Sequence, residues 1–277
     1  MNNPIGVCSW SYQKPLMEVA AEMERIQVRN VHLALQPFLE GDARHGAAEG
    51  AQARGHVEGL IDGGYWNVTA AMLSFSYEDY TSPVTIRKTG GIVPDDKWEA
   101  NKKLIVDAAK LARRFKTKYL TLHAGYLDEK NPAAVAKFTE RVQFLADTCA
   151  ENGLMLLLES GQETADDLVK FLKNTKGVGV NFDPANMLLY GMGDPVAAVA
   201  KLAPWIKHVH IKDATPSPKP GFEWGNETPW GDGKVNASAF LAALDKIGYQ
   251  GAFAVEREGG NSRTADIALA VKRLRAN

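Results

Sequence analysis

Four short apolar runs in the second half of the chain end in, or carry, a side chain that can bind a metal ion. The runs LMLLLE, VGVNFD, KHVHIKD and FAVE contribute Glu159, Asp183, His210 and Glu256, in that order. Carboxylates that converge in a buried place repel one another and have raised pKa values, and a divalent cation between them removes that conflict. Oxygen ligands with one imidazole favour Mn²⁺, Mg²⁺ or Co²⁺ over a thiolate-preferring metal, with Zn²⁺ or Fe²⁺ as alternatives.

These side chains can meet only if the runs that carry them are neighbouring strands. Short apolar runs alternate with amphipathic segments along the whole chain, at about 35 residues per unit for eight units in 277 residues. Such runs, rich in apolar and β-branched residues, are typical of parallel strands buried on both faces. The expected strands are Ile5–Trp10, Val31–Leu35, Trp66–Met72, Tyr119–His123, Leu154–Glu159, Val178–Asp183, Ile206–Ile211 and Ala252–Glu256.

The segments between these runs have the features of helices. Apolar residues recur at helical spacing in 240–247 and 267–274. Asn131 and Asp194 each precede a proline, which is typical of a helix start, and Gly153 stands where a helix is expected to stop. Eight strand–helix units without a linker predict a single (β/α)8 TIM-barrel domain over residues 1–277. The alternative, an open doubly wound sheet, needs a glycine-rich turn where this chain has CSWS.

Alternation along the strands predicts which polar side chains enter the barrel. Alternate residues of a barrel strand face its interior, so His208 faces the same side as His210. Thr121 and His123 of LTLHAG point inward for the same reason.

Two connections are longer than ordinary strand–helix loops. They are Ser74–Pro94 and Ala214–Val235. Active sites of α/β barrels are built from the loops at the carboxyl ends of the strands, so both segments are expected over that end.

Composition excludes several classes of protein. The chain has 32 Lys and Arg against 33 Asp and Glu, a formal net charge of −1, which argues against a nucleic-acid partner. Cys8 and Cys149 are too few for a disulfide framework or a cysteine zinc module. No apolar run is long enough to span a membrane, and the N-terminus lacks the pattern of a signal peptide. We therefore expect a cytoplasmic protein, although an export signal that had been trimmed would leave no trace here.

The order of the strand-end motifs resembles the sugar phosphate isomerase/epimerase family, a group of xylose isomerase-like TIM barrels related to endonuclease IV. The similarity covers nearly the whole chain and is strongest in LTLHAG, LLLESG, NFDPANM, HVHIKDA, PWGDGKV and FAVEREGG. It implies one divalent ion held by Glu159, Asp183, His210 and Glu256. His123 matches a strand-end histidine that is a ligand in the endonuclease branch, and here it is expected to contact the substrate or a ligand.

The resemblance also implies a reaction. A divalent ion would stabilise an enediolate formed next to a carbonyl, with Glu159 and Glu256 as the acid and base of a sugar isomerase or epimerase. A keto-sugar dehydratase or lyase shares the first step and is the alternative. A noncatalytic sugar-binding barrel and an endonuclease acting at abasic sites are further alternatives. The expected partner is a small carbohydrate, and a homo-oligomer remains open.

Departures from the family pattern narrow these alternatives. The endonuclease branch carries a histidine three residues after the aspartate, where this chain has Asn186, and a closely spaced Asp-x-His pair after the seventh strand. Here Lys234 follows GDG, and no histidine follows His210. Too few ligands remain for the endonuclease metal cluster, and Asn186 also departs from the ketose 3-epimerases.

Other polar and aromatic residues near the strand ends are expected to contact the substrate. These are His123, Asn186, His208, Lys212 and Trp230. Asn186 is alternatively expected to orient a metal ligand. Arg257 and Glu258 are expected to form a structural ion pair beside the site.

Overall fold

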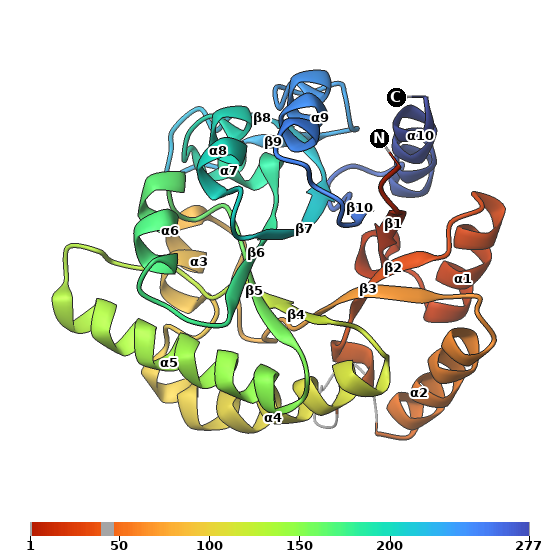
Figure 1. The fold of residues 1–277 in the computed structure, drawn as a ribbon, viewed down its shortest axis with the longest axis horizontal. Coiled ribbons are helices and arrows are strands. Elements are labelled where there is room, and N and C mark those ends of the chain that lie inside the picture. The colour runs from red at the N-terminus through yellow and green to blue at the C-terminus, as the bar shows by residue number, and fades with distance from the viewer. Residues whose placement is uncertain (1, 40–46, 277) are drawn as a thin grey trace.

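The computed structural model describes residues 2–39 and 47–276, which form a barrel of parallel strands surrounded by helices (Figure 1). The strands lie in the order β1-β2-β3-β4-β5-β6-β7-β10, and β1 pairs with β10 to close the barrel. This confirms the predicted (β/α)8 architecture. The bounds are β1 Ile5–Cys8, β2 Asn30–Ala34, β3 Asn67–Met72, β4 Tyr119–Leu122, β5 Met155–Glu159, β6 Val178–Phe182, β7 Ile206–Ile211 and β10 Phe253–Val255.

The helices form the outer layer of the barrel, and α5 and α8 begin at the two starts that the sequence predicts. Asn131 and Asp194 accept hydrogen bonds from the first backbone N–H groups of their helices, and Thr164 caps a third helix. Gly153 has a φ of +72°, the left-handed conformation expected after a helix. The bounds are α1 Leu16–Arg25, α2 Ala47–Asp62, α3 Pro83–Thr89, α4 Trp98–Arg114, α5 Pro132–Glu151, α6 Ala165–Leu172, α7 Pro184–Tyr190, α8 Pro195–Leu202, α9 Ala237–Lys246 and α10 Arg263–Arg275.

Several strands end one or two residues earlier than predicted. Residues 9–12 form a 3-10 turn rather than an extension of β1, and β4, β6 and β10 stop before His123, Asp183 and Glu256. At these positions the backbone leaves the ladder and turns toward the next helix. His123, Asp183 and Glu256 therefore stand at the rim of the barrel, directly after the last residue of their strands.

Both long connections carry structure of their own and contact each other. The first contains α3, and the second contains an antiparallel hairpin of β8 (Asp213–Thr215) and β9 (Asn226–Thr228). The Trp224 indole N–H in the second donates to the Tyr80 carbonyl in the first at 3.1 Å. The prediction that both segments lie over the same end of the barrel is confirmed.

The core combines the barrel interior with the layer between strands and helices. Its largest fully buried side chains include Phe38, Phe115, Phe182 and Phe240. Among the described residues, no helix combines the length and apolar character that crossing a bilayer requires.

The second long connection is fastened to the barrel by one carboxylate. Asp213, which is 1% exposed, accepts hydrogen bonds from the backbone N–H groups of Ala214, Gly231, Gly233 and Val235 at 2.8–3.1 Å. A side chain on Gly233 would collide with this carboxylate, so the glycine is required by the close approach. One charged group thus fixes the turn that follows β9.

We predict that Asp213→Asn lowers the free energy of unfolding by about 2 kcal/mol, because an amide cannot accept all of these hydrogen bonds and leaves buried N–H groups unpaired. Urea unfolding measures the change. Asp232→Asn is the matched control, since Asp232 makes only a half-exposed ion pair with Arg273 and should change stability by less than about 1 kcal/mol. Equal effects of the two substitutions would contradict this interpretation.

Candidate metal centre

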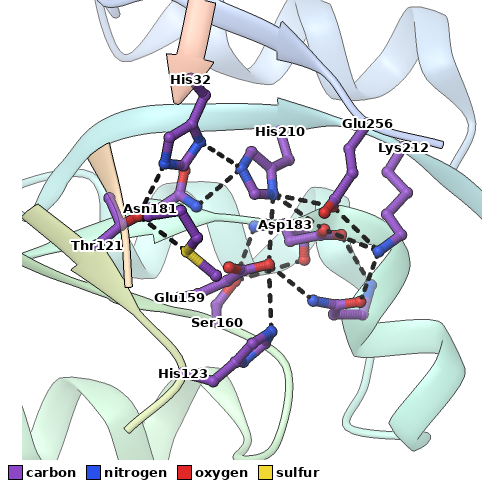
Figure 2. A network of polar contacts seen from close by, with 12 residues as sticks. His32, Thr121, His123, Glu159, Ser160, Asn181, Asp183, His210, Lys212 and Glu256 are labelled. Carbon is purple, nitrogen blue, oxygen red and sulfur yellow. Dashed lines mark hydrogen bonds and ion pairs between the residues drawn. The ribbon is translucent and has the colours of Figure 1, made fainter. Parts of the chain in front are cut away.

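The four candidate ligands converge at the carboxyl end of the barrel (Figure 2). The His210 Nδ1 atom lies 3.3 Å from Glu159 Oε1, 3.3 Å from Asp183 Oδ2 and 3.1 Å from Glu256 Oε2. One ligand atom from each residue lies within 4.8 Å of all the others. Each side chain is at most 5% exposed. The group could therefore hold a metal ion through three carboxylates and one imidazole.

Local backbone structure aims these side chains at one point. Asp183 is the N-cap of α7, and its Oδ1 accepts from the Asn186 backbone N–H at 2.9 Å, which leaves Oδ2 facing His210. Glu159 is the last residue of β5 and lies opposite Asn181 of β6. The Glu256 backbone N–H donates to the Ile211 carbonyl of β7 at 3.1 Å. Helix capping and strand register together fix the geometry.

A buried lysine balances part of this negative charge. Lys212 Nζ lies 3.0 Å from Glu256 Oε2, 2.9 Å from Glu258 Oε2 and 3.8 Å from Asp183 Oδ2. Burial alone would lower the pKa of Lys212, but the surrounding carboxylates raise it well above its usual value. The ammonium group therefore stays charged beside the centre.

The same charges keep the carboxyl groups ionised. Burial opposes ionisation of Glu159, but His123 and His210 lower its pKa below the usual value. Burial is outweighed in the same way at Asp183 and Glu256, where Lys212 and His210 lower both pKa values. All three groups are thus in the form that binds cations.

The donor set fits a divalent cation. Glu159 Oε2 is buried and has no hydrogen-bond partner, whereas Oε1 of the same carboxylate contacts His123, His210 and Asn186. A buried carboxylate oxygen without a partner is costly unless a cation or proton satisfies it. Hard oxygen donors with one imidazole suit magnesium, manganese or cobalt.

Two of the expected substrate-contacting residues lie beside Glu159. His123 Nε2 is 3.4 Å from Glu159 Oε1, and the His123 side chain is 14% exposed. The Asn186 amide donates to the same Oε1 atom at 3.1 Å, while its Oδ1 lies 3.5 Å from Lys212 Nζ. Asn186 therefore orients a candidate ligand, which was one of the two roles expected for it.

Two other residues that we expected to contact substrate at the mouth of the barrel, Trp230 and His208, lie elsewhere in the structure. Trp230 is 4% exposed and packs against Phe240 in the hydrophobic core, because the turn held by Asp213 folds its indole ring inward. His208 is 1% exposed and contacts Thr69 and Asn181 inside the barrel. Neither side chain reaches the cavity described below.

The expected Arg257–Glu258 ion pair is wrong. Arg257 pairs instead with Glu227 at 2.8 Å and Asp266 at 2.9 Å, while Glu258 turns to Lys212. Both residues lie in the loop after β10, where Arg257 meets Glu227 and Asp266 while Glu258 meets Lys212.

Sequence reasoning missed two residues that contact the candidate ligands. The Trp10 indole N–H donates to Glu256 Oε1 at 2.7 Å and so orients this carboxylate. His32 Nδ1 lies 2.9 Å from His210 Nε2. The signal for His32 was present, since a single imidazole interrupts the apolar run VHLAL of β2 at an inward-facing position.

A cavity of about 340 Å³ opens beside this centre, between the loops that follow β4 and β5. Glu159 is the one candidate ligand that lines it, together with His123. Its apolar wall includes Phe138 and Phe171, whose rings meet edge to face at 5.4 Å. Polar groups on its walls include Glu163. Of the four candidate ligands, Glu159 is the one that a small polar molecule in this cavity would contact.

We predict that Glu163 makes stability fall as pH rises. Burial raises the pKa of Glu163 from 4.5 to about 7. Between these two values the folded chain binds more protons than the unfolded chain, so stability decreases with increasing pH through this window and is then constant. Thermal unfolding from pH 4.5 to 8 should show a shallower decrease in Tm for Glu163→Gln than for the parent chain. Parallel curves would contradict the assignment.

Comparison with known proteins supports the architecture. The chain is similar to a xylose isomerase domain protein from Planctomyces limnophilus, with 27% identity, a TM-score of 0.85, and coverage of 99% of this chain and 96% of that one. It is also similar to the probable 3-DHS dehydratase AsbF from Bacillus anthracis, with 16% identity, a TM-score of 0.73 and 98% coverage of both chains.

A D-tagatose 3-epimerase-like protein has the same fold, with 17% identity, a TM-score of 0.73, and coverage of 99% of this chain and 96% of that one. A search of curated proteins found no significant match. A family model described as xylose isomerase-like TIM barrel matches residues 73–277, which include all four candidate ligands. The chain therefore belongs to the xylose isomerase-like TIM barrel family.

Proposed function

We propose that this chain is a divalent-metal-dependent enzyme that isomerises or epimerises a sugar or sugar derivative. The observation that carries the proposal is the convergence of Glu159, Asp183, His210 and Glu256 on one point, with Glu159 also lining a cavity. Family membership agrees with an enzyme acting on sugars, and one similar structure is named as epimerase-like. We assign Glu159, Asp183, His210 and Glu256 as ligands of one Mn²⁺, Mg²⁺ or Co²⁺ ion.

An ion held there would act as a Lewis acid toward a carbonyl and its neighbouring hydroxyl. The protein groups would then move protons at the adjacent carbon. Glu159 is the candidate base on the cavity side, where Asn186 and His123 contact its Oε1. Its ionised state at neutral pH matches that role.

Glu256 is the candidate partner that returns the proton. It comes from the end of β10, whereas Glu159 comes from β5, and both flank His210 Nδ1. Trp10 and Lys212 hold the Glu256 carboxylate by a hydrogen bond and an ion pair. Two carboxylates on different sides of the reacting carbon allow a proton to leave one face and return on the other, which inverts the centre.

Substrate oxygens would be bound by the polar groups that separate the centre from the cavity. His123 and Asn186 each keep polar atoms near Glu159, and Lys212 places a buried ammonium group beside the other carboxylates. A positively charged group near a developing enediolate stabilises it. We therefore retain His123, Asn186 and Lys212 as substrate-binding residues, and we leave Trp230 and His208 out of this role.

A keto-sugar dehydratase or lyase is the second candidate, and Glu163 favours it. Its carboxyl group lines the same cavity as Glu159 and has a pKa of about 7, close to the value at which an acid can protonate a departing oxygen. Proton removal by Glu159 would be the first step in either reaction. Only the fate of the enediolate differs.

We predict that Glu159→Gln and Glu256→Gln each lower kcat on the order of 10³-fold, because an amide neither removes the proton nor binds a cation well. Circular dichroism should show an intact fold. The control is Glu223→Gln, at an exposed position of the second long connection, which should leave kcat unchanged. Turnover retained by both active-site variants would rule out the two-glutamate mechanism.

Solvent exchange separates the two candidate reactions. We predict that turnover in D₂O with a divalent ion present gives an isomer or epimer that carries deuterium on carbon, measured by NMR or mass spectrometry. Loss of water or of another leaving group from the sugar would instead establish the lyase. Tight sugar binding without any exchange would make the chain a noncatalytic binding protein.

A further inference from the structure

The second nitrogen of His210 points away from the carboxylates and into the barrel. His210 Nε2 lies 2.9 Å from His32 Nδ1 and 3.1 Å from Asn181 Nδ2 (Figure 2). His210, His32 and Asn181 are all 0% exposed, so no water competes for these contacts. An imidazole that binds a cation through one nitrogen keeps one proton, and whatever these two neighbours accept or donate decides which nitrogen of His210 then carries it.

A first branch of hydrogen bonds runs from His210 through His32 and Thr121 to the backbone carbonyl of Ala71. His32 Nε2 lies 2.8 Å from Thr121 Oγ1, and the Thr121 hydroxyl is within 3.1 Å of the Ala71 carbonyl. A carbonyl only accepts, so Thr121 can donate to Ala71 and accept from His32 Nε2–H. His32 Nδ1 is then without a proton and accepts from His210 Nε2–H. This order of donors leaves the lone pair of His210 Nδ1 facing the three carboxylates.

A second branch has the same form. His208 Nε2 lies 3.0 Å from Thr69 Oγ1, and the Thr69 hydroxyl is within 3.3 Å of the Val31 carbonyl. If Thr69 donates to Val31 and accepts from His208 Nε2–H, then His208 Nδ1 must accept from the Asn181 amide nitrogen. Asn181 would then present its Oδ1 to His210 Nε2–H.

The opposite order of donors and acceptors also satisfies every group. It is the order that agrees with the orientation of the Asn181 side-chain amide in the structure. Asn181 Oδ1 lies 2.9 Å from His208 Nδ1, and Nδ2 faces His210. Both threonine hydroxyls then donate to the imidazoles, and His210 carries its proton on Nδ1, where it meets Asp183 Oδ2. A cation cannot bind a protonated nitrogen. Binding through Nδ1 therefore requires the first order and a reversed Asn181 amide.

We propose that the branches Thr121–His32 and Thr69–His208–Asn181 are positioning devices that hold His210 protonated on Nε2, so that Nδ1 is the nitrogen offered to the ion. The inference rests on the proposed function for the identity of the centre. It gives His32 and His208 a task inside the barrel that requires no contact with substrate. It also explains why polar side chains from β2, β3, β4, β6 and β7 enter the barrel interior.

A different use of the same atoms is a second metal site. Cys8, His32 and His210 also offer ligand atoms that lie within 4.8 Å of one another. The two imidazoles already pair with each other at 2.9 Å, and His32 Nε2 pairs with Thr121. Hydrogen bonds thus satisfy both nitrogens of His32 and the Nε2 of His210 without a second ion. We argue for the branch, and the stoichiometry of bound ion distinguishes the two.

The test compares Thr121→Val with Thr121→Ser in the full chain. Valine keeps the shape of threonine but removes the acceptor for His32 Nε2–H, whereas serine retains the hydroxyl. We expect Thr121→Val to raise the Kd for Mn²⁺ about 10-fold, in the range found for groups that orient metal ligands, and Thr121→Ser to stay within about twofold of the parent chain. Isothermal titration gives both the affinity and the number of ions.

Long-range ¹H–¹⁵N NMR of the histidine-labelled parent chain with Mg²⁺ reads the protonation directly and does not depend on how the variants fold. We expect His210, His32 and His208 all to carry the proton on Nε2. A proton on His210 Nδ1, two ions per chain, or equal Mn²⁺ affinity of Thr121→Val and the parent would overturn the inference. A parent chain that binds no divalent ion would contradict the proposed metal centre as well. Lost turnover alone would change neither the ion affinity nor the protonation seen by NMR.

Discussion

Mutual repulsion among three buried carboxylates is the constraint on which the rest of the site depends. Glu159, Asp183 and Glu256 are 0–5% exposed and lie around one imidazole nitrogen. Water cannot screen them there, so neighbouring groups must compensate their charge. Lys212 does so on one side, and an unpartnered oxygen of Glu159 remains on the other. A divalent ion would complete this balance, which is why we propose one at this point.

The barrel supplies the rigidity that such an arrangement needs. Four different strands end at the same rim, and each contributes one group within one residue of its end. Asp183 also caps a helix, so its free oxygen is fixed by the backbone of α7. Asp213 performs a comparable task further out, where it fastens a long loop through four backbone N–H groups. Precision at the centre is thus built from ordinary capping and strand register.

Much of this could be predicted from the sequence, because the barrel repeats one simple pattern. Apolar runs that end in Glu159, Asp183 or Glu256 indicate both a strand and the candidate ligand at its carboxyl end. Capping residues such as Asn131 indicate where helices begin. The sequence does not reveal partners that lie far apart along the chain. Pairing of His32 with His210 spans 178 positions and depends on barrel closure. The sequence places Trp230 among aromatic residues that could contact a sugar, but the turn around it directs the ring into the core against Phe240. Glu258 pairs with Lys212 rather than with its neighbour Arg257, which pairs with Glu227 and Asp266 from other parts of the chain.

Anomalous X-ray diffraction from crystals equilibrated with Mn²⁺ tests the central claim most directly. The account predicts one peak among these side chains, about 2.0–2.2 Å from His210 Nδ1 and from one oxygen each of Glu159, Asp183 and Glu256. A peak that approached His210 through Nε2, or full-occupancy manganese bound only elsewhere, would contradict it. So would a protein saturated with Mn²⁺ in which His210 Nδ1 still contacts the carboxylates with no ion between them.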